Sequence, residues 1–146
     1  MEIPINYLAV LVSALAAIIL GALWYGPLFG KAWMKEAGLT ADDVQRAKTD
    51  PKAKSAMMRS YVFMAVGALV MAYVFAHSLV FASYYLEMTG VGSGLTAAFW
   101  NWLGFIAPVT LAPMLWEGKS AKYWVITGGY YLVSLGIMGV ILGLWV

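Results

Sequence analysis

The chain contains no cysteine, which excludes disulfide bonds, thiolate metal sites, iron–sulfur clusters and thiol catalysis. Charge is also scarce: charged residues make up 11% of the sequence, whereas soluble globular domains carry about 25%. Histidine occurs once, as His77, which excludes bis-histidine haem within one chain and makes a weak metal site. We therefore predict no cofactor and no metal site.

Apolar residues are abundant instead. They account for 63% of the 146 residues, and the mean hydropathy is +0.81. A soluble core of this size could not bury so much apolar surface, because small domains leave a large share of their surface exposed. The composition predicts one transmembrane domain over residues 1–146, with the lipid bilayer as its surroundings and no nucleic-acid partner.

Four apolar runs are each long enough to cross a bilayer as a helix, which needs about 20 residues. Tyrosine and tryptophan stand near their ends, as amphipathic rings favour the headgroup level. No basic cluster precedes the first run, so we expect a retained membrane helix rather than a cleaved signal peptide. The predicted fold is an all-α integral membrane four-helix bundle, with spans at about 7–28, 61–86, 95–116 and 123–145.

The connection over residues 29–60 is the only polar segment of any length. Thr40 followed by Asp43 is typical of a helix start and predicts a short surface helix at about 41–48. A second start signal at Pro51 predicts that the second membrane helix begins before its apolar part.

The two other connections are short. Residues 87–94 read as a glycine-rich turn, and residues 117–122 as a shorter loop.

The basic residues indicate the topology. All of them lie in the first and third connections, which share one side of the membrane if there are four spans. Positively charged loops stay in the cytoplasm, so we expect loops 29–60 and 117–122 inside and both termini outside a plasma or inner membrane. The residues are Lys31, Lys35, Arg46, Lys48, Lys52, Lys54, Arg59, Lys119 and Lys122.

Small residues recur at every fourth position in two spans, a spacing that lets helices approach closely. They predict helix packing within the chain or, alternatively, a homo-oligomer interface. The residues are Ala9, Ser13, Ala17 and Gly21 in the first span and Gly139 and Gly143 in the fourth.

Two further patterns concern packing. Methionines repeat at every seventh position of the second span, as Met57, Met64 and Met71, and predict adaptable core packing. Pro108 and Pro113 interrupt the third span. The carbonyl groups that they free either line a small cavity or bond to neighbouring groups.

Ionisable residues inside a span are costly and often functional. His77 lies roughly 13 Å and Asn101 roughly 9 Å below the outer surface, counted from their span ends at 1.5 Å per residue. Because a short turn joins these spans, we predict a His77–Asn101 hydrogen bond, with Tyr73 and Asn6 as further members of a polar site. His77 is then either a bridge that holds two helices together or a proton relay or ligand-binding residue.

Trp24, Tyr25, Gly26 and Pro27 form a distinctive motif at the end of the first span, and Trp33 follows it. Proline cannot donate a backbone hydrogen bond and glycine loosens the chain, so a kink or an end of the helix is expected here. The aromatic rings then lie along the interface as anchors, or form a ligand-contacting corner.

This motif resembles that of a membrane family known as domain of unknown function 1761. Asn6 near the N-terminus, His77 late in the second helix and Trp100 at the opening of the third are similar to the family pattern. The resemblance spans most of the chain and implies a four-helix membrane fold. It implies no activity.

Three functions stay open at this point. The spans contain no nucleophile–base pair of the kind that hydrolases need, which favours a non-catalytic accessory or assembly subunit, or a homo-oligomer, over an enzyme. A small transporter is the second, with proton coupling left to His77. The third is a protein that binds a hydrophobic molecule such as a quinone, sterol or porphyrin.

Overall fold

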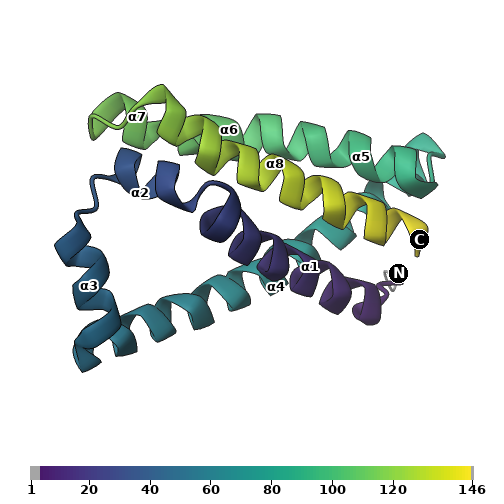
Figure 1. The fold of residues 1–146 in the computed structure, drawn as a ribbon. Coiled ribbons are helices and arrows are strands. Elements are labelled where there is room, and N and C mark those ends of the chain that lie inside the picture. Colours follow the sequence, from purple (N-terminus) through teal and green to yellow (C-terminus); the bar gives the residue numbers. More distant parts are fainter. Residues whose placement is uncertain (1–3, 146) are drawn as a thin grey trace.

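The computed structural model describes residues 4–145, and all regular elements over that range are helices. Four segments are long and apolar enough to cross a membrane: Tyr7–Leu28, Pro51–Tyr85, Gly90–Trp116 and Ala121–Leu144. The chain is therefore a multi-pass membrane protein of the all-α class, as its apolar runs predict. Pro4 and Trp145, near the two ends of the described range, line the same cavity, so these ends lie at one end of the molecule (Figure 1).

The first span begins as α1 (Tyr7–Leu23). Asn6 caps this helix: its side-chain oxygen accepts hydrogen bonds from the backbone N–H groups of Leu8 and Ala9, at 3.1 Å each. These N–H groups have no partner inside the helix, which is why asparagine is favoured at this position.

A kink ends the first span, as the motif predicts. The π-type turn η1 (Trp24–Leu28) contains Pro27 and closes with a 2.8 Å hydrogen bond from the Phe29 N–H to the Trp24 carbonyl. An amphipathic helix, α2 (Gly30–Ala37), follows immediately and was not predicted. Gly30 permits this sharp continuation, because a Cβ atom at that position would collide with a backbone carbonyl of η1.

The rest of the first connection agrees with the prediction. α3 (Ala41–Thr49) begins with a capping box in which Thr40 and Asp43 bond to each other's backbone N–H groups. α4 (Pro51–Leu86) begins after Asp50, which accepts a hydrogen bond from the Lys52 N–H. The second membrane helix therefore starts ten residues before the apolar run at about 61–86.

The third span starts earlier than predicted. The glycine-rich turn expected over residues 87–94 is wrong, because only residues 87–89 connect the helices and the later glycines are helical. Two prolines and a second π-type turn break the span into short pieces. These are α5 (Gly90–Asn101), η2 (Trp102–Ile106), α6 (Ala107–Thr110) and α7 (Ala112–Trp116).

Gly90 and Gly94 face α8 (Ala121–Leu144), the fourth span. A Cβ atom on Gly94 would collide with the Gly139 backbone, and one on Gly143 would lie 2.6 Å from the Gly90 carbonyl oxygen. Such contact is possible only where neither helix carries a side chain. We call this glycine contact the α5–α8 seam. The predicted Gly139–Gly143 pair thus packs within the chain, against α5.

The small residues of α1 are also used within the chain. Ala9, Ser13 and Ala17 are buried, at 0–1% exposure, where α1 packs on α4 and α8. Gly21 lies against the Tyr130 ring of α8, 3.3 Å from its hydroxyl oxygen when a Cβ atom is added. The small residues of α1 therefore let this helix pack closely against α4 and α8.

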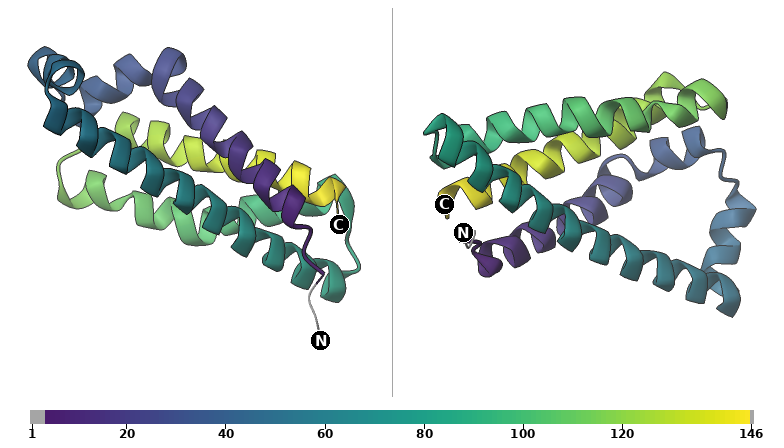
Figure 2. Two further views of the ribbon diagram at one scale, coloured as in Figure 1. Left: turned by 90° about the horizontal axis from the view of Figure 1, so that it is seen from below. Right: turned by 180° about the vertical axis from the view of Figure 1, so that it is seen from behind.

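The two halves of α4 differ in how far their side chains are buried. Its later part contributes Ala72, Phe75 and Leu79 to the core, whereas every residue from Lys54 to Met64 is exposed. Figures 1 and 2 show why: α4 crosses α1 and then diverges from the bundle. We call residues 51–67 the free half of α4. The prediction that Met57 and Met64 pack in the core is wrong, because these side chains are 40% and 55% exposed.

The two ends of the bundle differ in charge. All nine basic residues lie toward the end formed by α2, α3, the start of α4 and the loop before α8, which we call the basic end. Contacts between polar groups join α2 to α8 there. Lys119 donates to the Ala37 carbonyl (2.6 Å), Ser120 donates to Glu36 (2.5 Å), and Lys122 lies 3.9 Å from Glu36.

Candidate functional site

His77 faces away from the core of the bundle. It follows the buried Ala68 by nine residues, about two and a half turns, which places it on the opposite side of α4. Its Nδ1 lies 2.8 Å from the carbonyl oxygen of Tyr73. A carbonyl oxygen only accepts, so Nδ1 donates, and in the neutral ring Nε2 is left as an acceptor.

Aromatic rings continue from His77 towards the N-terminus. The ring centroids of Tyr73 and His77 are 4.4 Å apart, and the ring of Tyr7 stacks on Tyr73 at 6.5 Å. Because α4 crosses α1 at an angle, a residue that counting places deep in the membrane lies near the first turn of α1. His77 is thus close to the terminal end of the bundle.

Asn6 lies at this end as well. It lines a cavity of about 20 Å³ together with Ala76 and Val80 of α4 and Trp145 beyond α8. The space corresponds to about one water molecule. The structure therefore brings Asn6, Tyr73 and His77 to the same end, but the Asn6 oxygen is already engaged in capping α1.

Asn101 does not join this group. Its side-chain amide donates to the Ala97 carbonyl one turn earlier in α5, at 2.8 Å. The structure does not form the predicted His77–Asn101 hydrogen bond, since both side chains bond within their own helices. The alternative in which His77 bridges two helices loses its basis, because the ring is directed away from the core.

The tryptophan motif of the first span clamps α8. Trp24, the first residue of η1, donates its indole N–H to the carbonyl of Ile126 at 3.0 Å. Trp102, the first residue of η2, donates in the same way to Gly128 at 2.8 Å. Two kinked spans thus hold neighbouring carbonyls of one helix. Trp24 therefore packs against α8.

Missing side chains on α8 make room for these rings. A Cβ atom on Gly129 would lie 3.4 Å from the Trp24 ring, and one on Gly128 would lie 3.6 Å from Trp124. The Trp124 indole donates to Thr110 (3.1 Å) beside the proline-broken part of the third span. It also reaches the Ala107 carbonyl at 3.3 Å, so a neighbouring helix satisfies this backbone group.

The rest of the motif supports the clamp. Tyr25 packs on Trp33 and on Tyr130, with ring centroids 5.5 Å and 5.3 Å apart. Tyr130 is buried and donates its hydroxyl to the Ala17 carbonyl at 3.1 Å. The motif residues therefore hold α1, α2 and α8 together, and Gly26 leaves the helical conformation to allow the kink.

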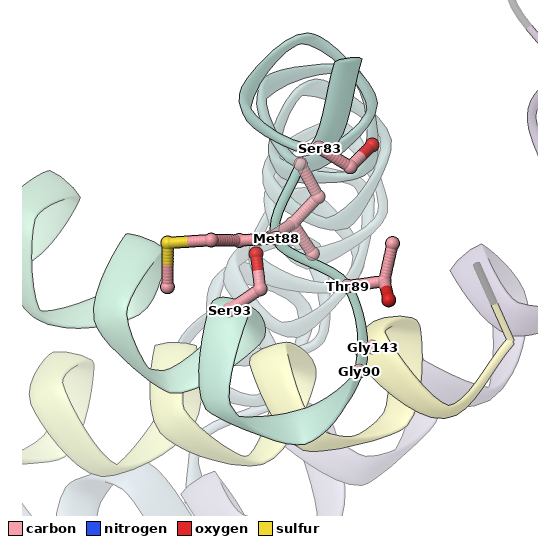
Figure 3. Close-up of a pocket in the computed structure, with 7 residues that line it drawn as sticks. Ser83, Met88, Thr89, Gly90, Ser93 and Gly143 are labelled. Carbon is pink, nitrogen blue, oxygen red and sulfur yellow. The ribbon is translucent and has the colours of Figure 1, made fainter. Parts of the chain in front are cut away.

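A second small cavity is also present. It lies where α4 ends and α5 begins, lined by Ser83, Thr89, Ser93 and Gly143 (Figure 3), and has a volume of about 10 Å³. Residues 4–145 contain no group of three or more histidine, aspartate or glutamate side chains that could hold a metal ion.

Sequence reasoning missed the inward tryptophans and Tyr130. The signal was present as glycine pairs, since Gly128 and Gly129 stand four residues after Trp124 and next to Tyr130. The sequence does not show which aromatic ring packs on each glycine, because that depends on which helices are neighbours in the fold.

Comparison with known proteins places the chain in a family. The model of the family described as Protein of unknown function (DUF1761) matches residues 8–143. No curated protein and no solved structure matched the chain. The match covers all four spans, the tryptophan motif and His77, and the chain belongs to this membrane protein family of unknown function.

Proposed function

We propose that the chain is a non-catalytic membrane subunit that assembles with further copies of itself or with other membrane proteins, and that the free half of α4 makes the contact. We further propose that the basic end faces the cytoplasm of a plasma or inner membrane, with the termini outside. The distribution of lysine and arginine supports this orientation.

The observation that carries the proposal is the unused small-residue face of α4. Ala56, Ser60 and Gly67 are exposed and share one side of the helix, at spacings of four and seven residues. A Cβ atom on Gly67 would meet no atom within 4 Å. Membrane helices associate through such faces, because lipid provides little hydrophobic drive and close packing must supply the energy.

Two other sets of small residues are already occupied. Those of α1 are buried against α4 and α8, and those of α5 and α8 face each other. The free half of α4 has neither kind of partner among the described residues. The free half of α4 therefore has a small-residue face on which a helix could pack closely, and no helix of the described residues packs there.

The test replaces Gly67 with leucine. This side chain has open space in the single chain, so the fold is expected to persist while a partner helix is held away. We expect native mass spectrometry to show loss of the oligomer or of the bound subunit. Val66→Leu is the matched control, since it adds bulk one residue away on another side of the helix.

Single cysteines locate the contact, because the natural chain has none. Ser60→Cys is expected to form a disulfide between copies in membranes if the partner is a second copy, and Val62→Cys, at similar depth on another side, is not. A protein that stays a monomer without any bound subunit in mild detergent and in membranes would refute the proposal.

A further inference from the structure

The free half of α4 and the first span diverge toward the basic end, and we call the space between their backbones the wedge. α1 and α4 are in contact near the termini and then separate, so that α2 and the start of α4 lie apart (Figure 1). α2 packs on η1 and α8, whereas the start of α4 packs on α3. α3 runs across the wide end from one side to the other, as the rear view also shows (Figure 2).

The wall of the wedge on α4 is apolar. Met71 packs against the core, and Met64 and Met57 precede it by one and two heptads, so all three share a side of α4 that reaches the core in the later part of the helix. Tyr61 lies one heptad before the buried Ala68 and shares this side. These side chains of the free half are 40–61% exposed. In a membrane, something apolar must cover them.

The rim of the wedge is basic. Seven of the nine basic residues lie between residues 31 and 59, against four acidic residues in the same range. Three of these acids are engaged locally: Glu36 accepts from Ser120, Asp43 takes part in the capping box, and Asp50 caps α4. The basic side chains in α2, α3 and the start of α4 are exposed. The net charge favours an anion here.

We propose that an anionic phospholipid occupies this wedge, with its acyl chains on the methionine side of α4 and its phosphate at Lys54. Lys54 lies two heptads before Ala68, so it stands on the same side as Met57 and Tyr61, about one turn closer to α3. A lysine near a phosphate gains charge-assisted hydrogen bonds, and anionic lipid is drawn to basic residues at the membrane surface.

A lipid fits this wedge better than a helix of another protein. α3 spans the wide end, and a transmembrane helix continues past the headgroup level, where it would meet α3. A phospholipid ends at its headgroup. Lys54 and Tyr61 lie on a different side of α4 from Ser60 and Gly67, whereas Met64 lies between the two sites, since it is within four residues of both Ser60 and Gly67.

The experiment compares lipids on the purified full-length chain by native mass spectrometry. We would titrate the protein with dioleoyl phosphatidylglycerol and, separately, with dioleoyl phosphatidylcholine, which has the same acyl chains and no net charge. The expected result is one tightly held phosphatidylglycerol per chain and weaker, unsaturable binding of phosphatidylcholine. Equal binding of both lipids would overturn the proposal, since it would indicate an ordinary lipid shell.

Two substitutions separate the wedge from general charge. Lys54→Ala is expected to weaken phosphatidylglycerol binding about fivefold, the effect of one lysine near an anionic headgroup. Arg59→Ala removes the same charge, but Arg59 lies on the opposite side of α4 and its loss is expected to leave binding unchanged. Equal losses in the two variants would refute a site in the wedge.

A third variant fills the space. Met64→Trp places a large ring on the exposed wall and is expected to displace the lipid while circular dichroism still reports a helical protein. The monomeric Gly67→Leu variant is expected to keep its lipid. If instead a dimer forms and phosphatidylglycerol is excluded from it, a second copy occupies the wedge and the lipid proposal fails.

Discussion

The α5–α8 seam and the free half of α4 show what a glycine does in two settings. At the seam, Gly94 and Gly139 bring two backbones into direct contact, and no side chain fits between them. In the free half, Gly67 also lies in a membrane helix, but its surroundings are empty within the chain. The same residue type therefore closes one interface and leaves another open. Burial by the partner helix, and not the residue itself, makes the difference.

The largest expected effect breaks the seam. Gly94→Ala forces α5 and α8 apart, because the new Cβ collides with a backbone that cannot move aside as a side chain can. Overpacking of this kind costs about 1–3 kcal/mol. We expect the free energy of unfolding, measured by titration with a denaturing detergent, to fall by that amount. Gly67→Ala is the control and is expected not to destabilise the monomer, because alanine favours helix. Equal effects of the two changes would contradict the comparison.

A smaller effect sharpens the role of the tryptophan clamp. Trp24→Phe and Trp102→Phe each remove one indole hydrogen bond to α8 and keep most of the ring. Hydrogen bonds between membrane helices contribute about 0.6 kcal/mol on average, with a maximum of about 1.7. We expect losses in this range from the same titration. Trp100→Phe, at an exposed tryptophan of the third span, is expected to have no effect.

The smallest effect concerns α3, which leads into the free half. Hydrogen bonds from the Thr40 hydroxyl and backbone hold the pKa of the Asp43 carboxyl below its ordinary value. The stability that this bond gives is present above the ordinary pKa of about 3.9 and is lost as the pH falls through the lower folded value. Carboxyl NMR titration is expected to show a higher Asp43 pKa in Thr40→Ala.

Hydrogen exchange tests whether this effect stays local. We expect the protection of α3 amides, relative to their intrinsic exchange rate at each pH, to be lower below the pKa of Asp43 than above it. The protection of amides at the α5–α8 seam is expected to stay the same. Faster exchange at the seam under those conditions would show that the two regions are coupled.

Much of the fold follows from local signals in the sequence. The four spans are predicted because length and hydropathy act within one helix, and α3 is predicted because Thr40 and Asp43 act across a single turn. α2 is missed because it directly follows a kink that reads as an end. The glycines from Gly90 to Gly94 are misread as a turn because glycine's value in α5 lies in its contact with a helix some fifty residues away.

The candidate site was less predictable. Counting residues along each span places His77 and Asn101 at similar depths in the membrane. The two side chains are nevertheless apart, because they point to different sides of their helices and the helices cross at an angle. His77 turns away from the core and bonds to its own helix, as does Asn101. Conversely, Trp24 and Tyr130 meet α8 and α1 across about a hundred residues of sequence, which no periodic pattern reports.

The sequence by itself determined that this protein crosses a membrane, where α3 and α4 begin and which connections carry the positive charge, because composition and capping are local properties. Only the tertiary structure decided which small residues are buried, that two tryptophans clamp α8 and that half of α4 stands free. These features depend on the distances between helix axes. In a lipid environment those distances follow from close contact between surfaces, and such contact involves residues that are far apart in the chain.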